Sequence, residues 1–149
     1  HTFTTLPGPV AGMPWVSAQL EAALKLVPRE KLALGIPVYG YNWFASTPTD
    51  GGARQFDKPS LNATFIDAAD VIKLAKTYNG RFAWDEQDRA ASMVFYRDNV
   101  REWVYYTDGR TFDERYQLVK RNRLAGFASW VLGSEDPAIW KLLPKRKGI

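Results

Sequence analysis

Two continuous apolar runs stand out in the pattern of hydrophobic and polar residues. They lie at residues 32–39 and 126–132, and each is shorter than a typical helix. Such runs predict strands that are buried on both faces of a parallel sheet. Each run ends in aromatic residues beside glycine. Because ligands bind at the carboxyl ends of strands in α/β sheets and barrels, these ends are candidate binding positions.

Apolar residues at helical spacing precede each of the two runs. The first helix is expected to begin at an N-cap at Ser17 and to end at Pro28. The second is expected behind a capping box formed by Thr111 and Glu114. A last short helix opens at residues 136–137, where proline takes the first helical position. Each strand therefore follows a helix, as in an α/β fold.

A different pattern lies between the two strands. A loop-rich stretch is followed by a helix that Asp67 caps and that runs to about Tyr78. Three short strand-like runs come next, at residues 81–84, 92–97 and 102–106. This middle part is predicted to be an antiparallel meander packed on one helix.

The amino-acid composition argues against several classes of function but does not identify one. Hydrophobic residues make up 46% of the chain and charged residues 24%, as in globular proteins, and six Trp, seven Tyr and eight Phe form either a large aromatic core or a stacking surface. The net charge of +4 comes largely from a helix end and the C-terminus, without interleaved aromatics, so no nucleic-acid partner is expected.

There is no cysteine and a single histidine, so no metal site and no cofactor are predicted. The chain has no apolar run of membrane-spanning length, so no membrane partner is predicted either.

Three stretches resemble glycoside hydrolase family 18, the chitinase-like family. KLALGIPVYG at 31–40 resembles the family's seventh barrel strand, and GFASWVLG at 126–133 resembles its eighth. WVYYTDGRT at 103–111 is similar to a stretch of the family's α+β insertion domain, and YNW at 41–43 is closer to the branch with bacterial spore-cortex and cell-wall glycosidases.

The resemblance implies an α/β fold class, the C-terminal part of a (β/α)8 TIM barrel. Strands 7 and 8 with their flanking helices would be joined by a small α+β insertion. The implied divisions are a barrel segment at 1–43, the insertion at 44–107 and a second barrel segment at 108–149. A secreted or cell-envelope location is also implied.

The implied activity is hydrolysis of β-1,4-linked glycans that contain N-acetylglucosamine, of the chitin or peptidoglycan type. The mechanism would be the substrate-assisted retaining one, in which the substrate's acetamido oxygen attacks the anomeric carbon. The family's acidic D-x-x-D-x-D-x-E run, whose last Glu is the general acid, is absent, and the DEQD cluster at 85–88 has the wrong spacing. No catalytic residue is therefore predicted in this chain, and the isolated chain is expected to be inactive.

Two alternatives remain open at this stage. One is a non-catalytic chitinase-like carbohydrate-binding protein, and the other is an unrelated α+β interaction domain. For an enzyme, the expected partners are the oligosaccharide substrate and either the missing N-terminal half of the barrel or a second copy of the chain, because two isolated barrel strands leave open edges.

Aromatic residues at the strand ends are the candidate substrate-binding groups. Trp130 matches the family's tryptophan that floors the sugar subsite where cleavage occurs, although a buried core position is the competing interpretation. Tyr41 stands where many chitinases have arginine, so its polar contact with sugar is in question. Period-two alternation divides the aromatics at 103–106 between two faces. The predicted substrate-binding residues are Trp130, Tyr39, Tyr41, Trp43, Trp103 and Tyr106.

Overall fold

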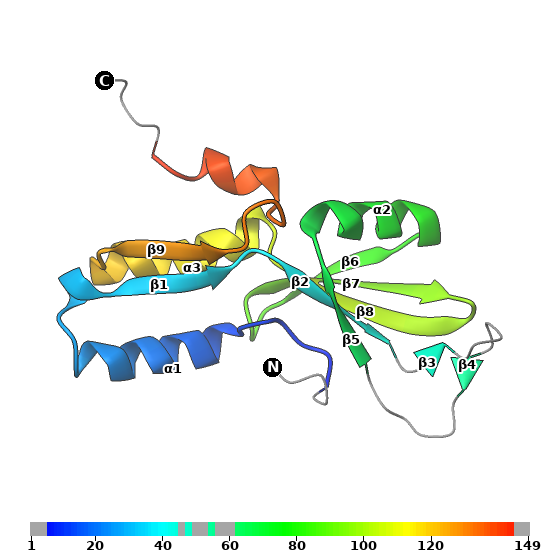
Figure 1. Ribbon diagram of the computed structural model, residues 1–149, viewed down its shortest axis with the longest axis horizontal. Helices are drawn as coiled ribbons and strands as arrows, with labels where there is room; N and C mark the ends of the chain where they lie inside the picture. Colours follow the sequence, from blue (N-terminus) through cyan, green and yellow to red (C-terminus); the bar gives the residue numbers. More distant parts are fainter. Residues whose placement is uncertain (1–5, 45–46, 49–53, 56–61, 145–149) are drawn as a thin grey trace.

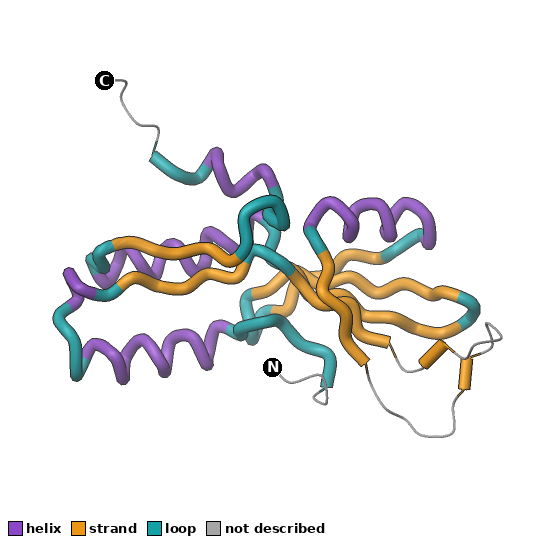
Figure 2. Tube along the Cα trace, viewed as in Figure 1, coloured by secondary structure: helices purple, strands orange, loops and turns teal. Residues whose placement is uncertain are grey.

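The chain folds as a mixed α/β protein in which two β-sheets lie end to end. The computed structural model describes residues 6–44, 47–48, 54–55 and 62–144 (Figures 1 and 2). A two-stranded parallel sheet, called the parallel pair below, joins a five-stranded antiparallel sheet. A short pairing of β3 (Thr47–Pro48) with β4 (Arg54–Gln55) completes the strands, and the rest of the loop predicted around residues 44–62 lies largely outside the described residues.

The two apolar runs form the parallel pair, β1 (Ala33–Pro37) and β9 (Gly126–Trp130). One face packs on α3 (Gly109–Asn122), with a core of Ile36, Val38, Phe112 and Ile139. The other face carries small exposed residues at 33, 35 and 128, so the prediction that both faces are buried is wrong for the described residues. Within those residues, no strand pairs with the outer edge of either β1 or β9.

The antiparallel sheet has the strand order β5-β2-β8-β7-β6. The predicted meander is confirmed as β6, β7 and β8, whereas β2 and β5 were not predicted. Gly40, the first residue of β2, sits where an added Cβ would collide with the Tyr105 carbonyl oxygen and with Tyr106. The strands are β2 (Gly40–Phe44), β5 (Asn62–Ile66), β6 (Arg81–Asp85), β7 (Ala90–Arg97) and β8 (Val100–Tyr106).

Helix α2 (Ala68–Tyr78) covers one face of the antiparallel sheet, as Figure 1 shows. The core between them contains Ile66, Val71, Met93, Phe95 and Val104. The predicted helix is confirmed, with Asp67 at the N-cap position. The opposite face, called the aromatic face below, carries Tyr41, Trp43, Phe65, Trp103 and Tyr105, which the antiparallel register places on one side.

The helix starts differ from those predicted. Helix α1 (Met13–Leu24) begins four residues before Ser17, with Gly12 as its N-cap and Pro14 in its first turn. Proline is accommodated there because the first-turn N–H groups have no intrahelical partner. Two short 3₁₀ helices complete the fold, η1 (Arg29–Lys31) and η2 (Pro137–Lys141).

Helix α3 is capped by Asp108 rather than by the predicted capping box. An Asp108 carboxylate oxygen accepts a hydrogen bond of 2.7 Å from the Thr111 peptide nitrogen. The Thr111 hydroxyl accepts one of 2.9 Å from the Ala91 nitrogen on β7, so it ties the helix to the antiparallel sheet. The carboxylate of Asp108, three residues before Thr111, therefore caps the helix.

Replacing Asp108 with alanine is expected to lower the free energy of unfolding by about 1 kcal/mol, the usual cost of a lost N-cap. Asp113→Ala is the matched control, because Asp113 accepts only a bond within the helix, from Gln117. That variant is expected to lose less than about 0.5 kcal/mol. Urea denaturation measures both, and equal losses would contradict the capping role of Asp108.

Candidate functional site

Trp130 lies at the carboxyl end of β9 with 69% of its surface exposed. Its carbonyl oxygen accepts a hydrogen bond of 2.8 Å from the Val38 peptide nitrogen, and the peptide bond to Val131 is cis. Its register partner is Pro37, so its side chain lies on the uncovered face of the parallel pair. The competing interpretation of Trp130 as a buried core residue is therefore wrong in this structure.

Tyr39 and Tyr41 form a row with Phe65 where the two sheets meet. The rings of Tyr39 and Tyr41 meet edge to face with centroids 5.7 Å apart, and Tyr39 stacks on Phe65 at 4.8 Å. Burial raises the pKa of the Tyr39 hydroxyl, and its hydrogen bond with Tyr41 raises it further. The structure thus brings two predicted residues together with one that was not predicted.

Two of the predicted residues, Trp43 and Tyr106, lie outside the row formed by Tyr39, Tyr41 and Phe65. Trp43 is only 1% exposed, in the strand between β5 and β8 and directly opposite Trp103, so its ring offers no face to a ligand. Tyr106 lies on the other face of the sheet, where it packs against the core beneath α2. Alternation along β8 explains this, because Tyr106 has the opposite orientation to Tyr105. The burial of Trp43 and the packing of Tyr106 beneath α2 do not favour contact of either ring with a ligand.

Trp103 and Tyr105 share the aromatic face with Tyr41. Both are partly exposed, and the Tyr105 hydroxyl donates a 3.4 Å hydrogen bond to Asp85. Burial raises the pKa of Tyr105, and the Asp85 carboxylate adds to the effect. Phe65, Tyr105 and Asp85 also belong to this surface and were not among the predicted site residues.

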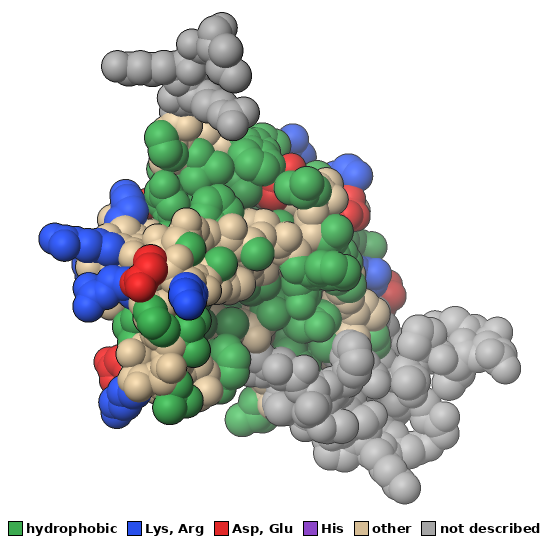
Figure 3. Space-filling view, turned by 60° about the vertical axis from the view of Figure 1, so that its left-hand side comes forward, with side chains coloured by type: hydrophobic (Ala, Val, Ile, Leu, Met, Phe, Trp, Pro, Cys, Tyr) green, Lys and Arg blue, Asp and Glu red, His purple; other side chains and the backbone are tan. Residues whose placement is uncertain are grey.

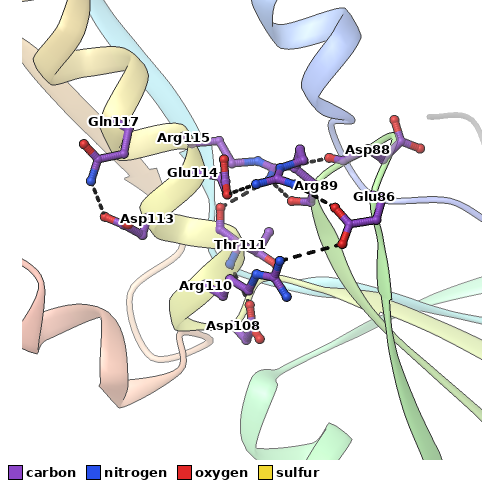
Figure 4. A network of polar contacts seen from close by, with 10 residues as sticks. All are labelled: Glu86, Asp88, Arg89, Asp108, Arg110, Thr111, Asp113, Glu114, Arg115 and Gln117. Carbon is purple, nitrogen blue, oxygen red and sulfur yellow. Dashed lines mark hydrogen bonds and ion pairs between the residues drawn. The ribbon is translucent and has the colours of Figure 1, made fainter.

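Arg115, a buried residue of α3, connects this helix with the antiparallel sheet and the N-terminal loop (Figure 4). Arg115 is only 2% exposed, and its guanidinium group donates to carbonyl oxygens of three segments. These are Ala11 in the N-terminal loop at 2.8 Å, Asp88 at 3.1 Å and Arg89 in the β6–β7 turn, and Thr111 of α3 at 3.2 Å. Burial lowers the pKa of Arg115 to about 10. This residue therefore fixes the antiparallel sheet against α3 and the N-terminal loop.

The described part of the chain offers no cluster of three His, Cys, Asp or Glu side chains that could hold a metal ion. Among the same residues, no helix is both long and apolar enough to cross a lipid bilayer. Exposed aromatic rings and hydroxyl groups remain as the functional chemistry of the site, and these groups suit a neutral, hydroxyl-rich ligand.

The buried tyrosines predict a loss of stability at alkaline pH. Burial raises the pKa of Tyr106 well above 10 in the folded chain. The unfolded chain ionises at about pH 10, so this contribution to stability is complete below that pH and is lost as the pH rises toward the folded value. We expect the free energy of unfolding to fall less steeply above pH 10 in Tyr106→Phe than in the wild type. Parallel curves from denaturation at a series of pH values would contradict this.

Comparison with known proteins identifies the family to which this chain belongs. The model of glycosyl hydrolases family 18 matches residues 7–135, so the chain belongs to this family. It is 26% identical over 148 residues to the uncharacterized glycosylase YvbX of Bacillus subtilis, a match that spans 97% of this chain and 39% of YvbX. It is 28% identical to the cortical fragment-lytic enzyme of the same organism, over 83% of this chain and 27% of that enzyme.

Solved structures agree with this assignment. The spore cortex-lytic enzyme SleL of Bacillus megaterium superposes with a TM-score of 0.78 at 26% identity, over 93% of this chain and 30% of SleL. A chitinase of Chromobacterium violaceum superposes with a TM-score of 0.77 at 27% identity, over 95% of this chain and 40% of the chitinase. The chain thus spans between about a quarter and two fifths of the length of these relatives.

Proposed function

We propose that this chain is the C-terminal part of a family 18 catalytic barrel. In this proposal β1 and β9 are the seventh and eighth barrel strands, residues 44–107 are the insertion, and 1–43 and 108–149 are the barrel segments. The parallel register of β1 and β9 and their helix on one face support it. A complete barrel takes about 250 residues, more than this chain has, and the match to YvbX spans only 39% of that relative, so both leave room for barrel strands outside this chain.

The proposed activity of the whole protein is hydrolysis of β-1,4-linked glycans containing N-acetylglucosamine. The observation that carries it is Trp130, exposed at the carboxyl end of a parallel strand beside the Tyr39–Phe65 stack. A flat indole packs on the apolar face of a pyranose, and its N–H group donates to a hydroxyl. The names of the relatives, a cortical fragment-lytic enzyme and a chitinase, support a glycan substrate of the peptidoglycan or chitin type.

The chemistry would be substrate-assisted, with a general acid that lies outside this chain. The full sequence has no D-x-x-D-x-D-x-E run, and Asp85 and Asp88 lie at the end of β6 and in the turn after it, with a spacing that does not match that run. Trp130, Tyr39 and Tyr41 would hold the sugar, while the substrate's acetamido oxygen would attack the anomeric carbon.

The partner proposed for the parallel pair is the remainder of the barrel or a second copy of this chain. The outer edges of β1 and β9 have no strand partner within the described residues, and their uncovered face exposes small side chains. Figure 3 shows large groups of hydrophobic side chains on the face that it displays, with basic side chains gathered toward one end. Such uncovered apolar surface is typical of a protein interface.

The experiment is a titration of the 149-residue chain with N-acetylglucosamine oligomers, in which tryptophan fluorescence and product release are followed together. We expect a fluorescence change without products. Glucose oligomers with the same linkage are the control, because they lack the acetamido group, and they are expected to bind more weakly. No response to either sugar would contradict the glycan site. Released products would contradict the placement of the general acid outside the chain.

A further inference from the structure

The stack at the junction of the two sheets has one exposed member and one supporting member. The planes of Tyr39 and Phe65 are 19° apart, with centroids separated by 4.8 Å, so one face of the Tyr39 ring is covered. The edge of Tyr41 meets the same ring. Phe65 itself is 48% exposed, at the edge strand of the sheet. More of the accessible aromatic surface of this stack therefore belongs to Phe65 than to the partly exposed Tyr39.

Phe65 lies close in the structure to the strand end that carries Trp130. Tyr39 follows Pro37, the register partner of Trp130, by two residues. The peptide nitrogen of Ala68, three residues after Phe65, donates a 3.0 Å hydrogen bond to the Ser134 carbonyl in the loop after β9. These links hold the end of β5 against the end of β9, and so the two exposed rings belong to one region of the surface.

The neighbours of Phe65 provide polar groups around an apolar ring. Its register partner on β2 is Tyr41, and the partner of Tyr41 on β8 is Tyr105, whose hydroxyl donates to Asp85. A sugar ring presents an apolar C–H face with hydroxyl groups around its rim. A flat hydrocarbon ring with a tyrosine hydroxyl group on the neighbouring strand matches this distribution, whereas Asp85, on the far edge strand of the sheet, is too distant to contact the same sugar ring.

We propose that Phe65 is a second sugar-stacking platform, with Tyr39 as the ring that supports it from behind. The ligand class is an uncharged pyranose unit of the same oligosaccharide that contacts Trp130, so the inference rests on the proposed function. Phenylalanine has no polar atom in its side chain, so the platform recognises the apolar face of the sugar and not a particular hydroxyl group. The platform is therefore expected to increase the affinity for oligomers that reach from Trp130 to Phe65, and not the affinity for the monosaccharide.

The test compares two variants that differ in ring shape. Phe65→Leu keeps an apolar side chain but removes the flat face, and we expect the dissociation constant for an N-acetylglucosamine oligomer to rise about fivefold to tenfold. Phe65→Trp keeps a flat face and is expected to bind at least as tightly as the wild type. Tyr96→Leu is the matched control, because Tyr96 is 52% exposed on the same sheet and lies near the C-terminal end of β7. Calorimetry gives the constants, and circular dichroism verifies the fold of each variant.

Each outcome decides the matter. Weaker binding by Phe65→Leu alone, with Phe65→Trp and Tyr96→Leu unchanged, supports the platform. Oligomer binding by the wild type that Phe65→Leu leaves unchanged overturns the platform while the proposed glycan site stands. Equal losses in Phe65→Leu and Phe65→Trp also overturn it, because a flat ring would then not be the recognised feature. A wild type that binds no oligomer overturns both the platform and the proposed function.

Discussion

Replacing Arg115 with methionine is expected to lower the free energy of unfolding by about 3 kcal/mol. The variant keeps much of the apolar stem but removes the Arg115 donor from the carbonyl groups of Ala11 and Arg89, while the Asp88 carbonyl keeps its bond from the Met13 peptide nitrogen. Each buried carbonyl that loses its partner costs about 1 kcal/mol or more. The loss is large because one side chain holds together three segments that are far apart in the sequence.

Urea denaturation followed by circular dichroism measures this effect. Arg121→Met is the matched control, since Arg121 is exposed on the same helix and bonds only to the Gln117 carbonyl of that helix. It is expected to change the free energy of unfolding by less than about 0.5 kcal/mol. Arg115→Lys should fall between Arg115→Met and the wild type, because an ammonium group reaches fewer carbonyls than the guanidinium fork. Equal stability of Arg115→Met and Arg121→Met would contradict the tethering role.

Replacing Trp130 with alanine is expected to weaken oligosaccharide binding by roughly thirtyfold, or about 2 kcal/mol, the effect of removing a central aromatic anchor. The free energy of unfolding is expected to change by less than about 0.5 kcal/mol, because the indole is 69% exposed. The Trp130 variant should therefore lose affinity for the oligosaccharide but keep its stability, whereas the Arg115→Met variant should lose stability.

Calorimetric titration with N-acetylglucosamine oligomers gives the affinity, and urea denaturation of the same samples gives the stability. The control is Trp15→Ala, since Trp15 is 62% exposed in the first turn of α1. We expect that variant to bind as the wild type does. A similar loss of affinity in both tryptophan variants would show that exposed indoles bind the sugar without site selectivity, and would contradict a specific role for Trp130.

Local sequence patterns predicted most of the fold. The continuous apolar runs predicted β1 and β9, and the punctuated short runs predicted β6, β7 and β8. Strand β2 was missed because Gly40 interrupts the apolar run, although this glycine is what allows β2 to lie close to β8. The start of α3 was misassigned because Asp108 and Thr111 both carry capping oxygens, and only the tertiary bond from Ala91 assigns Thr111 to another task.

The site was less predictable than the fold, because it depends on contacts between segments far apart in the sequence. Trp130 could be predicted from its place at a strand end, and its exposure agrees with that expectation. Trp43 shares the alternation of Tyr39 and Tyr41, yet it is 1% exposed whereas Tyr41, between the same two strands, is partly exposed, and the alternation does not predict this difference. Phe65 reaches the same surface only because β5 pairs with β2, and no pattern within residues 62–66 shows that pairing.

The chain enters and leaves the antiparallel sheet through neighbouring strands. Tyr41 on β2 lies directly opposite Tyr105 on β8, so the two connections to the parallel pair and to α3 lie side by side. The turn at Asp98 and Asn99, where both residues have a positive φ, closes the opposite end of β7 and β8. Extra residues at that turn would lengthen the loop between β7 and β8, at the end of the sheet opposite the junction, and leave Trp130 and its strand in place. It is therefore the position best suited to carry a spectroscopic label or a fused peptide.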